Sequence, residues 1–178
     1  MWLAPEELSK WGYNYCRHIK DDLEIRKNIT DSYWAYRYCK KIKDDPEIRK
    51  FITDSQWAYW YCRYIKDRPE MRKNITDTLW AFNYCLDIKD RPEIRKLLIT
   101  DSKWSYYYCI YKKDRPEMRK NITESFWAYY YCKDIKDIPE VRKYIKEGEC
   151  GYNSCRKKDL KLENILRGMN VVRSKRNV

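Results

Sequence analysis

One aromatic hexapeptide returns along this sequence at a nearly fixed spacing. It reads WAYRYC from Trp34 to Cys39 and WAYWYC from Trp57 to Cys62, and further variants follow. Seven cysteines, from Cys16 to Cys155, close these segments at intervals of 23, 23, 23, 24, 23 and 23 residues. Such a period is typical of repeat proteins, in which each unit buries against its neighbours an apolar face that it cannot cover alone.

Each repeat predicts a pair of short helices. Asp31 and Ser32 are suited to cap a first helix, in which five side chains share one apolar face at about 100° per residue: Trp34, Ala35, Tyr38, Cys39 and Ile42. Pro46 suits the first position of a second helix, roughly to Ile52, because its missing N–H would have no partner there anyway.

The predicted fold class is therefore all-α, a solenoid of about seven 23-residue helix-turn-helix repeats. We expect one repeat domain over residues 1–166, with regular units over about 31–146 and an atypical capping unit at each end. A basic C-terminal tail, residues 167–178, no longer follows the repeat pattern, and we expect Gly168 to end the preceding helix.

The unit W-A-Y-x-Y-C-x-x-I-K-D-x-P-E-I-R-K resembles short α-helical tandem repeats of phage and bacterial proteins of unassigned function. Those repeats carry Trp-Ala-Tyr-x-Tyr-Ala followed by a Pro-Glu helix. The resemblance covers roughly residues 9–146, with cysteine in the usual alanine place. It implies an α-helical repeat protein encoded by a phage or virus, and it supplies no activity and no catalytic residues.

Composition and cysteine spacing exclude several classes of protein. No apolar run approaches the roughly 20 residues of a membrane-spanning helix, and the N-terminus has no signal-like core. Most of the eight cysteines occur once per repeat, which favours buried free thiols over disulfides or a metal site. We therefore expect a protein of the host cytoplasm, with no metal, no cofactor and no membrane partner.

An enzyme is the least favoured class. The aspartates recur at two places of the repeat, where a helix cap and a turn explain them. The four glycines are scattered, so no phosphate-binding loop is present.

Two variable places on the first helix, four residues apart, give the strongest candidate for a binding site. Large aromatic and basic residues occupy them, and such residues are enriched at interface hot spots. The candidates for partner binding are Arg37, Lys41, Trp60, Tyr64, Tyr107, Tyr111 and Tyr130. The alternative is that these side chains pack against the next repeat and complete the core.

Basic residues give a second candidate. Three arginines precede the prolines of successive repeats, and the tail adds further cations: Arg68, Arg91, Arg115, Arg173, Lys175 and Arg176. They could bind nucleic acid together with exposed aromatics. The alternative is ion pairing of the arginines with the turn aspartates, and a tail without a role.

The net charge of +12 favours an acidic partner without choosing among the kinds of acidic partner. We expect a non-enzymatic binding protein that engages or inhibits a host protein. Binding of RNA or single-stranded nucleic acid is the alternative, and incompletely capped end units leave a homodimer open.

Overall fold

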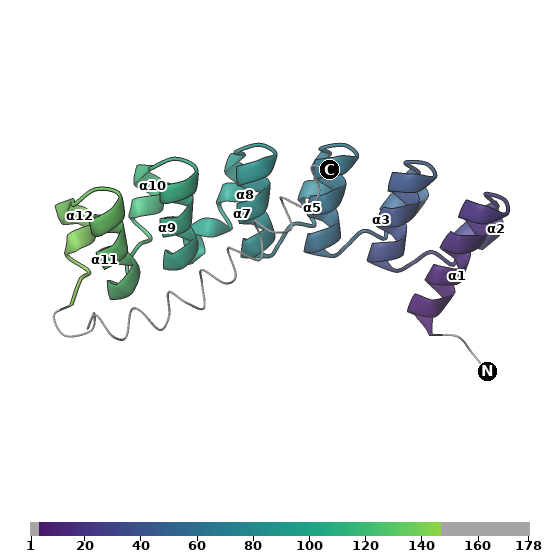
Figure 1. Cartoon of the computed structure of the whole chain (residues 1–178), viewed down its shortest axis with the longest axis horizontal. Coiled ribbons are helices and arrows are strands. Elements are labelled where there is room, and N and C mark those ends of the chain that lie inside the picture. The colour runs from purple at the N-terminus through teal and green to yellow at the C-terminus, as the bar shows by residue number, and fades with distance from the viewer. Residues whose placement is uncertain (1–3, 147–178) are drawn as a thin grey trace. The chain divides into compact units, whose positions relative to one another are not determined.

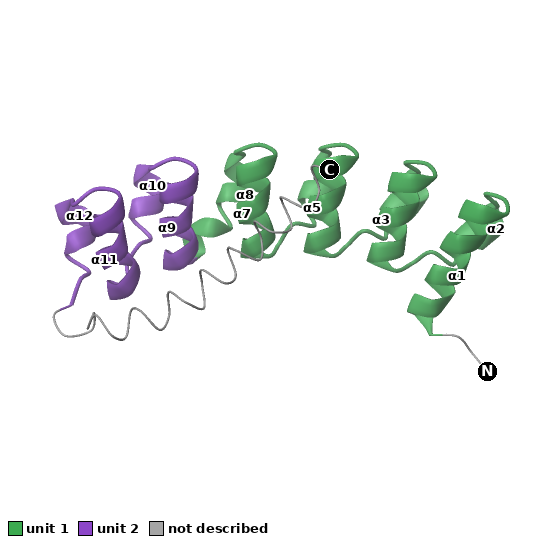
Figure 2. Cartoon of the chain, viewed as in Figure 1, with its two compact units in different colours: residues 1–100 green, residues 101–178 purple. Residues whose placement is uncertain are grey.

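The computed structural model describes residues 4–146, and all regular structure in that range is helical (Figure 1). The chain divides into two compact units, residues 1–100 and 101–178 (Figure 2). Each unit is a row of helix pairs, so the predicted all-α repeat fold is confirmed. The seventh repeat and the tail fall outside the described residues.

In the first unit, the first helices are α1 (Pro5–His18), α3 (Ser32–Lys41), α5 (Ser55–Tyr64) and α7 (Thr78–Asp87). Each is followed by a four-residue second helix: α2 (Leu23–Arg26), α4 (Pro46–Arg49), α6 (Pro69–Arg72) and α8 (Pro92–Arg95). A 3₁₀ turn, η1 (Leu98–Thr100), ends the unit. The second unit holds α9 (Ser102–Tyr111), α10 (Pro116–Arg119), α11 (Ser125–Asp134) and α12 (Pro139–Arg142).

The helix boundaries follow from local chemistry. The side chain of Asp31 accepts hydrogen bonds from the backbone N–H groups of Tyr33 and Trp34, at 3.0 and 3.1 Å, which satisfies donors that the helix cannot pair. The second helix is shorter than the predicted Pro46–Ile52. It ends at Arg49, because the chain then continues with i→i+3 hydrogen bonds and turns back towards the next first helix.

The predicted apolar face of the first helix is buried. Ala35, Tyr38 and Cys39 lie in the core, and the second helix and its turn add Ile48 and Ile52. Successive first helices then pack side by side, α1 on α3, α3 on α5 and α5 on α7, and α9 on α11 within the second unit. Because α3 and α5 each pack against two other first helices, they bury side chains on two faces in addition to the face that covers their own second helix.

A serine in the first turns of α1, α3, α5 and α9 joins each of these helices to the next helix pair. Ser32 Oγ donates to the carbonyl of Phe51 at 2.8 Å and accepts from the N–H groups of Thr53 and Asp54 at 3.0 and 3.2 Å. We call this contact the serine bridge. It recurs at Ser9, Ser55 and Ser102.

The repeat that begins with Thr78 departs from this pattern. Within residues 4–146 the hydroxyl of Thr78 makes no such bridge, and the same repeat is one residue longer than the others. The extra residue, Ile99, lies in η1, between Leu98, which is buried in the place of Ile52, and Thr100. A single turn of 3₁₀ helix thus takes up the insertion while keeping the buried position filled.

Candidate binding surface

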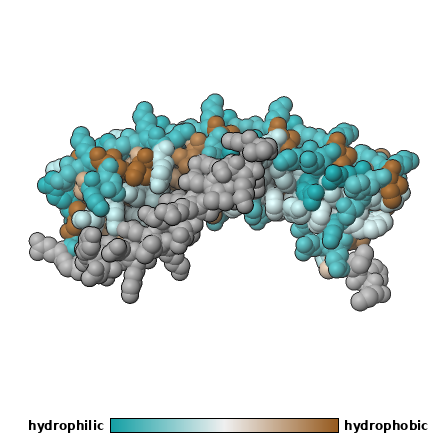
Figure 3. Space-filling model, in the orientation of Figure 1, coloured by the Kyte–Doolittle hydropathy of each residue, from teal (hydrophilic) through white to brown (hydrophobic). Residues whose placement is uncertain are grey.

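The variable places of the first helices combine exposed and packed side chains. Lys41, Tyr64 and Tyr111 are exposed, Arg37, Trp60 and Tyr130 are half-buried, and Tyr107 is buried. On the face seen in Figure 3, hydrophobic side chains form separate patches among hydrophilic ones. The candidates therefore do not form one continuous exposed surface, and their contacts differ from residue to residue.

The clearest exposed group lies on α3 and α5. The rings of Trp60 and Tyr64, one helical turn apart, are stacked with centroids 5.4 Å apart and planes at 8°. The Trp60 ring also packs on Trp80 of α7, with centroids 6.1 Å apart, and this contact holds the Trp60–Tyr64 pair against the next helix. The ring of Tyr64 faces solvent. Aromatic side chains held in this way offer contact area with little conformational freedom left to lose.

One lysine of α3 contacts this stacked pair, and a second lysine follows it in the sequence. The ammonium of Lys40 lies 4.3 Å from the centroid of the Tyr64 ring and donates to the hydroxyl of Tyr36 at 3.0 Å. Lys41 is exposed, and neither lysine pairs with a carboxylate within residues 4–146. We name Lys40, Lys41, Trp60 and Tyr64 the α3–α5 cluster. It joins an exposed aromatic ring to two positive charges that the described chain leaves unneutralised.

Arg37 is instead part of the packing. Its guanidinium lies 5.1 Å from the Tyr13 ring and 5.3 Å from the Trp34 ring, and it donates to the hydroxyl of Tyr33 at 2.9 Å. These contacts hold the cation between aromatic rings of neighbouring first helices, where it contributes to the junction.

In the second unit, the expected exposure of Tyr107 is not found. The centroid of its ring lies 5.5 Å from that of Trp127 on α11 and 5.8 Å from that of Trp104. Tyr107 thus packs against the next repeat, as the alternative interpretation of the sequence had it. Tyr130 packs on Phe126 at 4.9 Å. Of the candidates in this unit, Tyr111 remains exposed, and the neighbouring Ile110 is exposed as well.

The arginines predicted to form a basic ridge bind their own chain. Arg68 donates to the hydroxyl of Tyr61 and to Asp44, both at 3.0 Å. Arg91 bonds Tyr84 and Asp67 in the same way, and Arg115 donates to Tyr108 at 3.0 Å. The sequence alternative of ion pairs with the turn aspartates matches these contacts. Arg173, Lys175 and Arg176 lie outside the described residues.

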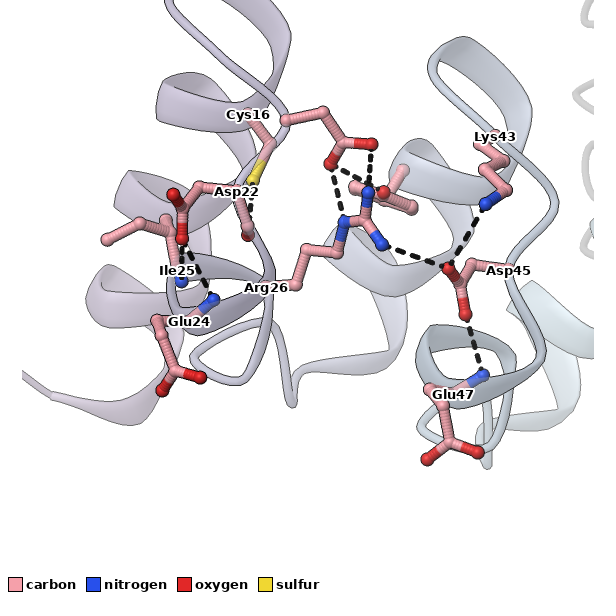
Figure 4. A network of polar contacts seen from close by, with 10 residues as sticks. Cys16, Asp22, Glu24, Ile25, Arg26, Lys43, Asp45 and Glu47 are labelled. Atoms are coloured by element: carbon pink, nitrogen blue, oxygen red, sulfur yellow. Dashed lines mark hydrogen bonds and ion pairs between the residues drawn. The ribbon is translucent and has the colours of Figure 1, made fainter.

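These arginines belong to a polar network that links successive helix pairs. Asp21 accepts from Arg26 of its own pair at 2.6 Å and from the hydroxyl of Tyr38 of the next pair at 2.7 Å. Arg26 also reaches Asp45 at 3.3 Å (Figure 4). The same arrangement recurs around Asp44, Asp67 and Asp114.

The network sets the protonation of its members. Burial alone would raise the pKa of Asp44, but hydrogen bonds from Tyr61, Arg68 and Arg49 outweigh it and lower that pKa below its ordinary value. For Asp67 the donors are Arg72, Tyr84 and Arg91, with the same result for the pKa. The turn aspartates thus stay charged as structural acceptors.

The cysteines are buried, with the exception of the half-buried Cys132, among the described residues. Burial raises the pKa of the Cys39, Cys62 and Cys109 thiols to about 12, since a thiolate would lose its solvation there. In residues 4–146, no three His, Cys, Asp or Glu side chains gather as metal ligands would.

Two parts of the junction were not predicted from the sequence. Tyr36 falls outside the predicted apolar face, yet it is buried because its ring stacks on Trp57 of the next repeat at 5.4 Å. The serine bridge was also missed. The recurrence of Ser and Thr 21 residues apart, as in Ser32 and Thr53, was the available signal.

Within the described part of the chain, no helix combines the length and the apolar character needed to cross a membrane. Comparison of the chain with protein-family models, with curated proteins and with solved structures gave no match.

Proposed function

We propose that this chain is a non-enzymatic helical-repeat protein that binds a protein partner, and that the α3–α5 cluster is the centre of the binding surface. The observation that carries the proposal is the contact of the exposed, stacked Tyr64 ring with Lys40, next to the exposed Lys41 in the sequence. Neither lysine has a carboxylate partner among the described residues. Desolvated aromatic anchors beside charged groups are typical of interface hot spots.

The chemistry of the cluster favours a partner that presents carboxylates next to an apolar side chain. Apolar contact with the Tyr64 ring would exclude water, and carboxylates would neutralise the lysines. The resemblance to phage and bacterial repeats supports a host protein as the target, which the chain would engage or inhibit.

Affinity capture from a host-cell lysate, with and without nuclease, followed by affinity measurements on the captured partner, tests this proposal. The variant Lys41→Glu/Tyr64→Ala should bind at least about tenfold more weakly, the effect of losing about 1.4 kcal/mol at a hot spot. The matched control is Lys73→Glu, which makes the same change of charge at an exposed position on the second-helix side. Equal binding by both variants would contradict the proposal.

Nucleic-acid binding is the other outcome of the same experiment. Arg68 and Arg91 form ion pairs with Asp44 and Asp67. Exposed lysines such as Lys66 and Lys89 would therefore be the residues that bind phosphate groups. Material that disappears with nuclease, and whose binding weakens steeply between about 50 and about 200 mM salt, would identify this mode.

A further inference from the structure

The junction between successive helix pairs is built from three parts, of which two recur at every described junction and the third, an arginine–acid pair, recurs along the first unit. In the first part, a tyrosine of one first helix packs on the tryptophan that begins the hexapeptide of the next. The centroid distances are 5.3 to 5.5 Å, for the pairs Tyr13–Trp34, Tyr36–Trp57, Tyr59–Trp80 and Tyr106–Trp127. This aromatic contact is common to all the junctions described, and further rings add to it at some of them.

The other two parts are polar. A tyrosine hydroxyl of the following pair donates to the turn aspartate of the preceding pair, as Tyr38 does to Asp21 at 2.7 Å. The arginine of the preceding second helix reaches an acidic group at the start of the following one, as Arg26 does to Asp45 (Figure 4). A helix pair therefore has a receiving edge, with Tyr, Asp and Arg, and a docking edge, with Trp, Tyr and an acid.

The receiving edge of α11–α12 has no partner among the described residues. Tyr129 is 37% exposed, whereas the equivalent Tyr36 is 7% exposed. The side chain of Asp137 is 54% exposed, against 26% for Asp44, and Arg142 bonds only this aspartate, at 2.6 Å. Each of the three groups is thus present, and each lacks the contact that completes it elsewhere.

The next repeat in the sequence does not carry the matching residues. Twenty-three residues after Trp127 and Tyr131 stand Cys150 and Ser154. Cysteine has no ring to pack on Tyr129, and the serine hydroxyl is several atoms shorter in reach than that of tyrosine.

The docking edge of α1–α2 carries all three. Trp11 is 45% exposed, whereas Trp34 is 8% exposed against Tyr13. The Tyr15 hydroxyl, in the place of Tyr38, bonds no described residue. Asp22 caps α2 through Oδ1, as Asp45 caps α4, which leaves its Oδ2 for an arginine.

We propose that this protein associates with a second copy of itself from head to tail, the α1–α2 pair of one molecule docking on the α11–α12 pair of another. Trp11 packs on Tyr129, the Tyr15 hydroxyl donates to Asp137, and Arg142 pairs with Asp22. The contact continues the repeat junction between molecules. Because it joins two different edges, it is heterologous, and it generates an open chain of molecules or a closed ring.

Sedimentation velocity on the full 178-residue chain tests the proposal. The wild type should form larger species as its concentration rises from about 1 µM to about 1 mM, a range that covers weak to moderate association. Trp11→Ala removes the docking edge and Tyr129→Ala the receiving edge, so each variant alone should stay monomeric. An equimolar mixture should give a dimer that grows no further, since one intact edge of each kind remains.

Three results would overturn the proposal: a wild type that is monomeric throughout, single variants that assemble like the wild type, or a mixture that stays monomeric. Far-ultraviolet circular dichroism establishes that the variants are folded, and Asp137→Lys blocks the receiving edge through an exposed side chain if Tyr129→Ala does not fold. Lys73→Glu, at an exposed position that belongs to neither edge nor to the α3–α5 cluster, should assemble as the wild type does.

Discussion

The carboxylate of Asp44 receives donors from two helix pairs, namely Arg49, Tyr61 and Arg68. Replacing it by asparagine removes the charge and leaves the largely buried Arg49 with one of its two counter-ions, the half-exposed Glu70. We expect Asp44→Asn to lower the free energy of unfolding by about 1 to 3 kcal/mol, the range for hydrogen bonds to charged groups. Urea denaturation measures this change.

The chain contains a matched control for that substitution. Asp137 stands at the same place of the last described repeat and pairs with Arg142, but both side chains are exposed. Since water can replace the lost contacts, Asp137→Asn should cost much less than Asp44→Asn. If the two substitutions were equally destabilising, the inter-repeat network would not be the cause.

The lowered pKa values of Asp44, Asp67 and Asp114 give a direction to the pH dependence. A carboxyl whose pKa is lower when folded stabilises the protein above its unfolded pKa, about 3.9, and loses this contribution as the pH falls through the folded value. The free energy of unfolding should therefore fall on acidification below about pH 4. Urea denaturation of Asp67→Asn at several pH values should show a smaller fall, and an identical fall would exclude these groups.

The cysteines allow a prediction about reactivity. The thiolate is the reactive form, and a pKa of about 12 leaves almost none of it at neutral pH in Cys39, Cys62 and Cys109. In a Cys150→Ala/Cys155→Ala background, we expect an aromatic disulfide reagent to react slowly with the native protein and rapidly in denaturant. The half-buried Cys132 should react first. Fast reaction of all six thiols would show that the repeats open readily.

At the scale of the element, the serine bridge is the contact most open to test. Ser32→Ala removes one donor and one acceptor and leaves the N–H groups of Thr53 and Asp54 without the hydroxyl oxygen. We expect a loss of about 1 to 3 kcal/mol in the free energy of unfolding, measured by urea denaturation. Thr78 stands at the same place of its repeat and makes no bridge to a described residue, so Thr78→Ala should lower the free energy of unfolding by less. An equal loss in both variants would show that the bridge does not stabilise the protein.

Single-sequence reasoning recovered the elements because their signals are local. An Asp cap, a proline at the first helical position and a face formed by Trp34, Tyr38 and Cys39 each act within one helix pair. The same reasoning failed for residues that pack against the neighbouring helix pair. Tyr36 and Tyr107 point away from the predicted face and are nevertheless buried, since helical periodicity describes one packing face and a solenoid helix has two.

The same limit applies to the candidate site. Lys41 and Tyr64, expected to face solvent, are exposed. Arg68 and Arg91 looked equally available in the sequence, but their partners lie in the preceding repeat, 24 residues away. A contact over that separation has no local signature, although the fixed period places the same Asp and Arg at this separation in successive repeats.

At the scale of the whole molecule, stability should vary along the row of helix pairs. In the first unit, α2 buries no side chain, whereas α4 buries Ile48 and Arg49. Helices at an edge contact one neighbour and open more readily. Hydrogen exchange followed by mass spectrometry should therefore show faster exchange in α2 than in α4, and the reverse order would contradict this account.

The serine bridge has a consequence for how such a protein can diversify. Apart from the hydroxyl of a threonine two residues further on, Ser32 bonds main-chain atoms around the side chain of Phe51, and Ser55 bonds the same atoms around Asn74. Because these bonds go mainly to the backbone, the bridge does not depend on which side chain stands at the place of Phe51 or Asn74. Substitutions on the outer surface of one repeat can therefore accumulate while its attachment to the next is unchanged, so that new binding specificities can arise without redesign of the scaffold.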